Sequence, residues 1–499
     1  GHVQGRGGTR GGRTARSGSV SGTAPEIVPG WETVIGLEVH AELATVTKMF
    51  SGAPNRFGGE PNTNIDPVSL GLPGTLPVLN GRAVELAIRV GLALNCTVQR
   101  SVFARKNYFY PDMPKDFQIS QFDLPINGEG WLELADGRRI GIERAHLEED
   151  TGKSTHVGGG GRIHEAGHSL VDYNRAGVPL IEIVGRPDLR GTEDARAYVS
   201  ELRSILVAIG ASDGKMEEGS MRVDCNVSVR TVGQVELGTR CEVKNINSLR
   251  SLGRAIEYES RRQVDLLTAG ERIEQQTRHW NEDEGRTHKL RSKEEAFDYR
   301  YFPEPDLMPV EPSEEWIAEI RAALPLLPRE RRHRLAEAAG VETSATSLTV
   351  DRGLDDLAMA TIHLGAGAGR VLVHLENNLA DGVGLLTAES FAALIALETG
   401  GDLTATQAKT VLASLVAEGG DPAAIASAKG FEAMDSGELE AIVDRIIAEH
   451  PDDWAALIAG DDKERKKKSG FFVGEVMKAT RGQADGRAVN ELLARRSAG

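Results

Sequence analysis

Residues 34–40 read Val34-Ile35-Gly36-Leu37-Glu38-Val39-His40, and this stretch predicts a β-strand with two unlike faces. Side chains alternate along a strand, so the odd-numbered aliphatic residues face one side while Glu38 and His40 face the other. The aliphatic side can pack into a core, which leaves a carboxylate beside an imidazole on the opposite side. Such a pair suits metal binding or proton transfer, but it is also compatible with an ordinary solvated face.

Further elements are predicted on either side of this strand. Val223–Arg230 is another alternating run, and a helix is expected to start with Thr192 as its N-cap and to stop at Gly210. Strands and helices do not alternate regularly here, which favours an α+β fold over a doubly wound sheet. After Pro312 the strand signals vanish and Ala, Leu, Glu and Arg dominate, so the remainder is predicted to be helical.

Length and charge limit the class of protein. A chain of 499 residues is too long for a single hydrophobic core, so two to four domains are expected. The composition of residues 1–30 predicts a disordered leader. No run approaches the ~20 apolar residues that cross a bilayer. The net charge of −16 speaks against DNA as a partner, and RNA binding would need a local basic patch. Three widely spaced cysteines fit reduced thiols in a cytoplasmic protein.

Acidic residues gather in two further segments. His146-Leu147-Glu148-Glu149-Asp150 holds three consecutive acids, which suit Mg²⁺ bridging ATP phosphates but also a solvated surface. The segment 217–226 runs from an acidic glycine turn into a strand. On that strand Arg222, Asp224 and Asn226 share one face, a set that suits metal–phosphate chemistry unless the face is merely solvated.

Two segments offer phosphate contacts. Asn174 and Arg175 lie on a turn before an apolar strand, where the guanidinium can meet a phosphate or the turn can be purely structural. Glu242 and Lys244 share a strand face further along the chain. No segment fits the P-loop pattern. Thr151-Gly152-Lys153-Ser154 resembles the end of that pattern, but the pattern also requires a glycine at position 147, which is Leu147. Any use of ATP therefore lies outside the P-loop scheme.

The C-terminal segment is basic although the whole chain is acidic. Residues 463–496 hold ten Lys or Arg and four Asp or Glu, and they include Lys466, Lys467 and Lys468 in succession. Such a patch can bind RNA by displacing the counterions condensed on its phosphates. A solvated tail is the alternative interpretation.

Taken together, several segments resemble a known family. They are Gly36-Leu37-Glu38-Val39-His40, Lys106-Asn107-Tyr108-Phe109-Tyr110-Pro111-Asp112, His146-Leu147-Glu148-Glu149-Asp150, Asp172-Tyr173-Asn174-Arg175-Ala176-Gly177-Val178-Pro179-Leu180, Asp298-Tyr299-Arg300-Tyr301-Phe302-Pro303-Glu304-Pro305-Asp306-Leu307 and Val473-Gly474-Glu475-Val476-Met477-Lys478. In this order they closely resemble the GatB family, the B subunits of aspartyl/glutamyl-tRNA(Asn/Gln) amidotransferase. The likeness runs from about Trp31 to the end of the chain and departs where Asp485-Gly486 replaces a commoner Asn-Pro.

The resemblance implies an architecture and a reaction. It implies a glutamine synthetase-like catalytic cradle at residues 31–310, an all-helical domain at 311–427 and a small helical, YqeY-like, tRNA-binding tail domain at 428–499. ATP would phosphorylate the side-chain carboxylate of Glu on Glu-tRNA(Gln) or Asp on Asp-tRNA(Asn), and ammonia would displace the phosphate. A partner A subunit, an amidase with glutaminase activity, would release that ammonia from glutamine, and a small C subunit would complete a heterotrimer.

The resemblance also implies site residues, carried over by position. The expected metal ligands are Glu38, His40, Glu149 and Glu218, and Asp150 and Arg222 complete the expected catalytic set. The expected ATP contacts are Asn174, Arg175, Asp224, Asn226 and Lys244. Mg²⁺ is the expected ion, and Mn²⁺ can substitute because a histidine beside carboxylates is unusual for strict Mg²⁺ selectivity. Lys106-Asn107-Tyr108 is expected to line the ammonia route.

Two other functions fit parts of the sequence. One is a stand-alone ammonia ligase of the glutamine synthetase type, although a small substrate needs neither the basic tail nor the long helical half. The other is a non-catalytic tRNA-binding scaffold. The chain shows no Gly/Ser-rich amidase signature and no candidate Cys–His glutaminase pair. We therefore expect the nitrogen to come from a partner.

Overall fold

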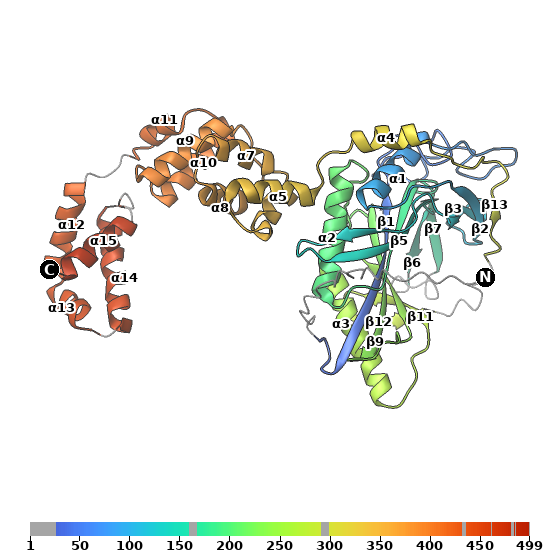
Figure 1. Cartoon of the computed structure of the whole chain (residues 1–499), viewed down its shortest axis with the longest axis horizontal. Helices are drawn as coiled ribbons and strands as arrows, with labels where there is room; N and C mark the ends of the chain where they lie inside the picture. The colour runs from blue at the N-terminus through green and yellow to red at the C-terminus, as the bar shows by residue number, and fades with distance from the viewer. Residues whose placement is uncertain are drawn as a thin grey trace, which may run out of the picture. The chain divides into compact units, whose positions relative to one another are not determined.

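The computed structural model describes residues 26–158, 167–290, 299–431, 436–460, 462–480, 484 and 486–498. It divides into two compact units. The first runs to Leu324 without Ala135–Arg138, and the second comprises those four residues and the chain from Pro325 onward. The described strands all belong to the first unit, and the second is helical (Figure 1). The predicted mixture of helices and strands is thus confirmed. The predicted leader lies outside the described residues as far as position 25.

The first unit is built on one large sheet. Its strands and those of a small separate sheet are β1 (Trp31–Glu42), β2 (Val102–Asn107), β3 (Phe117–Leu124), β4 (Gly130–Glu133), β5 (Arg139–Glu149), β6 (Lys153–Val157), β7 (His168–Asp172), β8 (Pro179–Gly185), β9 (Met221–Thr231), β10 (Cys241–Ile246), β11 (Gln276–Asn281), β12 (Arg286–Lys289) and β13 (Phe302–Pro303). The large sheet has the order β12-β11-β10-β9-β1-β8-β5-β3-β2-β13, with β4 beside β5, while β6 pairs with β7. Among the described pairs, only β10 and β11 run parallel.

The predicted strand at 34–40 forms the middle of β1. As expected, Ile35, Leu37 and Val39 are buried, whereas Glu38 and His40 keep partial exposure. The described helices of this unit are α1 (Gly81–Ala93), α2 (Thr192–Ala208), α3 (Leu249–Thr268) and α4 (Glu314–Ala322). Helix α3 packs on β9, β10 and β12, and it touches the aliphatic side of β1 where the Thr33 hydroxyl lies 3.2 Å from that of Ser260. Helix α2 packs on α3 and β1, and α1 packs on β5 and α4.

The start of α2 differs from the prediction by one residue. Gly191, with fully extended backbone, occupies the N-cap position, and Thr192 is the first helical residue. Glu193 and Asp194 still lie in the first turn, where acidic side chains complement the positive end of the helix dipole. The predicted stop is confirmed, because Gly210 follows the helix with φ +67°, a conformation that glycine adopts without strain.

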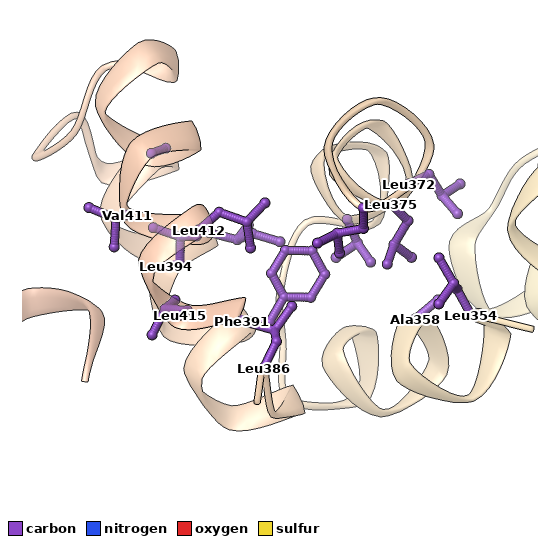
Figure 2. Packing of buried hydrophobic residues seen from close by; sticks show 14 of the residues in the cluster. Leu354, Ala358, Leu372, Leu375, Leu386, Phe391, Leu394, Val411, Leu412 and Leu415 are labelled. Atoms are coloured by element: carbon purple, nitrogen blue, oxygen red, sulfur yellow. The ribbon is translucent and has the colours of Figure 1, made fainter. Parts of the chain in front are cut away.

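The second unit contains two separate hydrophobic cores. Its helices are α5 (Pro328–Ala339), the short 3₁₀ helix η2 (Thr343–Thr346), α6 (Ser347–Asp351), α7 (Asp355–His363), α8 (Ala368–Asn378), α9 (Ala388–Gly400), α10 (Ala405–Glu418), α11 (Pro422–Ala428), α12 (Ser436–Glu449), α13 (Pro451–Ala459), α14 (Asp462–Ala479) and α15 (Gly486–Ala498). One core spans residues 335–431, and Figure 2 shows the Phe391 ring in its middle, between Leu375 and Leu394. The other core spans residues 439–493.

Two further features bear on the compositional predictions. Within the described part of the chain, no helix combines the length and the apolar character that a membrane span requires. Cys96, Cys225 and Cys241 are free and buried, and burial raises the pKa of the Cys96 thiol to about 12. These thiols are therefore weakly reactive in the folded chain.

Candidate active site on the polar face of the sheet

The even-numbered side of β1 belongs to a continuous polar face. Strand register sets Glu38 opposite Asp224 of β9, and it sets His40 between Arg222 of β9 and Glu182 of β8. Glu182 in turn lies opposite His146 of β5. Residues that face each other across neighbouring strands project from the same side of a sheet. Charged side chains from four strands therefore meet on one surface.

His40, Glu148 and Glu182 form the first group on this face, here termed the histidine cluster. The Nε2 atom of His40 lies 3.8 Å from a carboxylate oxygen of Glu148 and 3.8 Å from one of Glu182. One potential ligand atom from each of the three residues lies within 4.8 Å of the others. One nitrogen and two carboxylate donors suit Mn²⁺ and accept Mg²⁺ less readily.

Glu38, Asp224 and Glu242 form a second group, here termed the lysine cluster because Lys244 reaches into it. The Lys244 Nζ lies 2.6 Å from Asp224 and 2.8 Å from Glu242. Asn226 donates a hydrogen bond of 3.0 Å to Glu38. Three carboxylates here also have ligand atoms within 4.8 Å of one another, but an internal ammonium already balances part of their charge.

Asp150, Arg222 and Arg175 form a third group, the arginine cluster. Arg222 donates to Asp150 at 2.8 Å, and the Nε atom of Arg175 lies 3.4 Å from the same carboxylate. Arg175 also donates to the backbone oxygens of Thr151 and Gly152, both at 3.0 Å. Each arginine side chain remains about one-third exposed, so both can meet a phosphate while Asp150 holds them in place.

Burial and mutual repulsion shift the pKa values of these acids. Burial, followed by repulsion from Glu182, raises the pKa of Glu38. Burial and then Glu182 also raise the pKa of Glu148. Burial works in the same direction on Glu182, but contact with His146 and the nearby His40 together hold its pKa well below the usual range. Glu182 therefore ionises more readily than Glu148.

Burial also raises the pKa of Glu42 to about 7, and repulsion from Asp150 adds to that effect. Glu42 ends β1, next to the arginine cluster, and Arg222 and Arg175 partly offset the rise. The polar face thus carries a carboxyl group that titrates near neutral pH.

Aromatic side chains border the histidine cluster. Phe122 and Tyr301 stack with ring centroids 5.4 Å apart, and Phe122 meets the edge of His146 at 6.4 Å. The Arg144 guanidinium lies 4.7 Å from the centre of the Phe122 ring. Burial, and then the charge of Glu148, raise the pKa of Tyr301, as expected for a phenol next to this cluster.

Most of the predicted site residues share this face. His40 belongs to the histidine cluster, and Asp150, Arg175 and Arg222 make up the arginine cluster. The remaining four, Glu38, Asp224, Asn226 and Lys244, lie in or beside the lysine cluster. They are brought together by strand register and by the turn that carries Arg175.

Three predicted site residues lie elsewhere, so the expected metal set does not form one site. Glu149 points to the opposite side of β5, where it is 2% exposed and accepts hydrogen bonds from Lys115 at 2.5 Å and from the Ile119 amide at 3.0 Å. Glu218 pairs with Lys215 at 2.9 Å on a turn before β9. Neither belongs to a group of potential ligands among the described residues. The structure thus does not bring these two residues to the groups of potential ligands, and metal binding by either of them stays a prediction.

Asn174, the third of these residues, has a structural role in the turn that also carries Arg175. Its side chain accepts a hydrogen bond from the Asn64 amide at 2.8 Å and donates one to the Glu60 oxygen at 2.7 Å. It thus holds the loop around residues 59–64 on the turn that precedes β8, as the Asx-turn interpretation of the sequence expects.

Sequence reasoning missed three residues of the histidine cluster and its surroundings, namely His146, Glu148 and Glu182. A usable signal was present. Along a strand, His146 and Glu148 share a face that Glu149 cannot share, so alternation applied to this segment selects Glu148. Glu182 becomes a candidate only when the pairing of β8 with β1 is known.

The comparisons with known proteins agree with an enzyme of two differently built parts. Residues 33–318 match the model of the GatB/GatE catalytic domain, and residues 374–496 match the model of the GatB domain. The sheet unit that carries the three clusters is thus a catalytic domain of the GatB/GatE type.

Curated relatives match this chain over nearly its whole length. The chain is 50% identical over 488 residues to the B subunit of aspartyl/glutamyl-tRNA(Asn/Gln) amidotransferase from Nocardia farcinica, with 94% of this chain and 96% of the relative covered. It is 50% identical over 494 residues to the protein of that name from Salinispora arenicola, with 94% and 97% covered. The Corynebacterium diphtheriae protein is 49% identical over 493 residues, with 95% and 98% covered. The chain therefore belongs to the GatB family of amidotransferase B subunits.

Proposed function

We propose that this chain carries the amide-forming site of an ATP-dependent tRNA amidotransferase. The substrate is glutamate on tRNA(Gln), aspartate on tRNA(Asn), or both. The observation that supports this most directly is the position of the histidine and arginine clusters on one polar face, joined by the neighbouring residues His40 and Arg222. Metal-ligand acids next to two guanidinium groups suit the transfer of a phosphoryl group.

The proposed reaction has two steps. A side-chain carboxylate oxygen of the esterified amino acid attacks the γ-phosphorus of ATP, and ADP leaves. The nitrogen of ammonia then attacks the carbonyl carbon of this acyl phosphate, and inorganic phosphate leaves as the nitrogen loses a proton. Activation is needed because oxide is a poor leaving group, whereas phosphate is a good one.

Each cluster has a proposed role that follows from the chemistry of its residues. His40, Glu148 and Glu182 would hold Mg²⁺ or Mn²⁺, which supplies positive charge next to the phosphates. Arg222 and Arg175 would contact phosphate oxygens, with Asp150 fixing their orientation. Lys244, Asn226, Asp224 and Glu38 would border the nucleotide.

Partners complete the proposal. Ammonia would come from glutamine hydrolysed in a partner amidase, the A subunit, with a small C subunit in the same cytoplasmic heterotrimer. Lys106 would lie on the ammonia route, because its Nζ lies over the Tyr299 ring at 4.6 Å and its charge reaches Glu148. The sheet unit would be a glutamine synthetase-like cradle, followed by a helical domain and a YqeY-like tail domain that binds tRNA.

The test uses the assembled complex with ATP, glutamine and each misacylated tRNA, scoring amide formation and glutamine hydrolysis separately. His40→Ala and Glu148→Gln should each lower amide formation by ~10²-fold or more, since they remove charge neutralisation in the transition state. Glutamine hydrolysis should fall much less. His288→Ala is the matched control, because His288 belongs to β12 at the end of the sheet and pairs with Glu284.

The outcomes separate this function from its alternatives. Amide formation on free glutamate and ammonium without tRNA would indicate a stand-alone ligase. Near-normal amide formation by both cluster variants would remove the catalytic assignment and leave a tRNA-binding scaffold. Robust glutamine hydrolysis by the isolated chain would contradict the division of labour between the proteins of the complex.

A further inference from the structure

His146 is a buried imidazole to which the proposed chemistry gives no task. Its side chain is 1% exposed, and within the described part of the chain Nδ1 forms no hydrogen bond, while Nε2 meets Glu182 at 3.2 Å without the alignment of a full hydrogen bond. Leaving a buried polar group without a hydrogen bond is destabilising by about 1–3 kcal/mol. An apolar side chain of similar size would avoid this penalty, so packing alone does not explain why a histidine occupies this position.

The geometry directs the ring at the two carboxylates of the histidine cluster. Its Nε2 atom lies 3.2 Å from Glu182 and 3.9 Å from Glu148. Because Glu182 is opposite both His40 and His146 in the strand register, the two imidazoles flank it from β1 and from β5. Glu182 thus lies between two histidines.

The two histidines are not equivalent. The side chain of His40 is 19% exposed, and its nitrogen belongs to the group of atoms that lie within 4.8 Å of one another. The nitrogens of His146 do not belong to that group, and its ring is enclosed. His40 is therefore placed to meet an ion, whereas His146 is placed behind the carboxylates.

Neighbouring side chains restrain the His146 ring. Phe122 packs against it edge to face, with ring centroids 6.4 Å apart, and Tyr301 stacks on Phe122. The Arg144 guanidinium lies over the Phe122 ring. A ring held by such packing can orient a neighbouring carboxylate without losing further side-chain entropy when an ion binds.

We propose that His146 is a positioning residue, which holds the Glu182 carboxylate, and with it Glu148, in the orientation that binds a divalent cation together with His40. This inference rests on the metal site of the proposed function and adds a residue to it. Partners that orient ligating groups typically contribute a factor of ~10–100 to metal affinity. His146 should act through Glu182, without contacting the substrate.

The experiment measures Mn²⁺ binding to the full-length chain by titration calorimetry, without ATP or tRNA. His146→Phe should weaken the affinity by roughly 10–100-fold, because the ring shape stays but the donor is lost. His146→Gln should recover most of the affinity, since its amide N–H can replace the Nε2–H. Thermal unfolding of each variant checks that the sheet unit is intact, and His40→Ala serves as the variant without a ligand.

The outcomes distinguish the two proposals. If the parent chain does not bind Mn²⁺, or if His40→Ala binds it as well as the parent, the metal site itself is wrong and the inference falls with it. If the parent binds and His40→Ala does not, but His146→Phe binds as tightly as the parent, only the role of His146 is overturned. Equal weakening by Phe and Gln in folded protein would show that an N–H group at this position does not restore the binding geometry, which also overturns it.

Discussion

The ammonium group of Lys244 lies between two carboxylates, 2.6 Å from Asp224 and 2.8 Å from Glu242. Burial alone would lower the pKa of Lys244, but these two acids raise it above its usual value. The lysine therefore stays charged and compensates a group of three acids that also includes Glu38. The histidine cluster contains no such internal cation among its members.

This difference predicts how many ions the site binds. Lys244→Met should raise the stoichiometry from one Mn²⁺ per chain to two, because removing the ammonium leaves Glu38, Asp224 and Glu242 uncompensated. Electron paramagnetic resonance of free Mn²⁺ measures the change. Lys215→Met is the control, since it removes a lysine paired with Glu218 on a turn outside both clusters. An unchanged stoichiometry of one would contradict the compensating role.

The arginine cluster predicts a defect in ATP binding. Arg222→Met should raise KM for ATP by ~10-fold or more, because the variant keeps the packing of the stem but loses the fork that meets phosphate. KM for charged tRNA should change much less. Arg230→Met, on the same face of β9 and paired with Glu32, is the matched control. Equal effects of the two variants on ATP would argue against a phosphate contact at Arg222.

The burial of Lys48 predicts that the free energy of unfolding depends on pH. It is 1% exposed, and burial lowers its pKa to about 8, although Asp66 and Glu149 partly oppose that effect. Since the folded pKa is below the unfolded one, the penalty of burying the charge is full below pH 8 and is relieved as pH rises toward the unfolded pKa. Relative to Lys48→Met, the parent should therefore gain roughly 3 kcal/mol of stability across that window.

Urea unfolding of both chains at a series of pH values measures the difference for Lys48. The comparison cancels the titration of other groups, which the two chains share. A stability difference independent of pH between 7 and 10 would show that Lys48 titrates normally in the fold.

The core of residues 335–431 predicts a destabilisation confined to the second unit. Phe391 is 0% exposed in the middle of that core (Figure 2), so Phe391→Ala should lose about 3–5 kcal/mol. Leu385, which is 60% exposed, provides the control Leu385→Ala with little effect. Calorimetry should show a lower unfolding temperature for the second unit only. A parallel shift of the sheet unit would contradict their independence.

The basic tail predicts a salt-dependent contribution to tRNA binding. Lys466 and Lys467 are exposed, whereas Lys468 pairs with Asp453. Lys466→Ala combined with Lys467→Ala should raise KM for charged tRNA and flatten its dependence on log[salt] by about one for each phosphate that is no longer bound. Turnover at saturating tRNA should change little, because phosphate contacts position RNA without reading it.

Two comparisons complete the test of the tail. Lys409→Ala, at an exposed position of α10, should leave tRNA binding unchanged. Deletion of residues 432–499 should reproduce the tail defect more strongly, and because residues 439–493 have their own core while the core of residues 335–431 stays whole, the remaining chain should keep its unfolding temperature. Unchanged affinity in a stable truncated chain would leave the tail without a role in binding.

The sequence by itself determined the two-faced strand at 34–40, the helical character after residue 312 and the family, because these depend on local periodicity and on motif order. It also selected most residues of the polar face, since alternation along one strand is a local property. It selected Glu149 from its position in a motif, whereas the structure places Glu148 with His40 and Glu182 on the polar face, because side chains alternate along β5.

Only the tertiary structure decided which acids meet. Glu182 is far from His40 in sequence and becomes its neighbour through the pairing of β8 with β1, and His146 joins them through the pairing of β5 with β8. Likewise, Glu218 is close to Arg222 in the chain but pairs with Lys215 on a turn. The register of an antiparallel sheet is fixed by contacts over the whole core, so no short segment contains it.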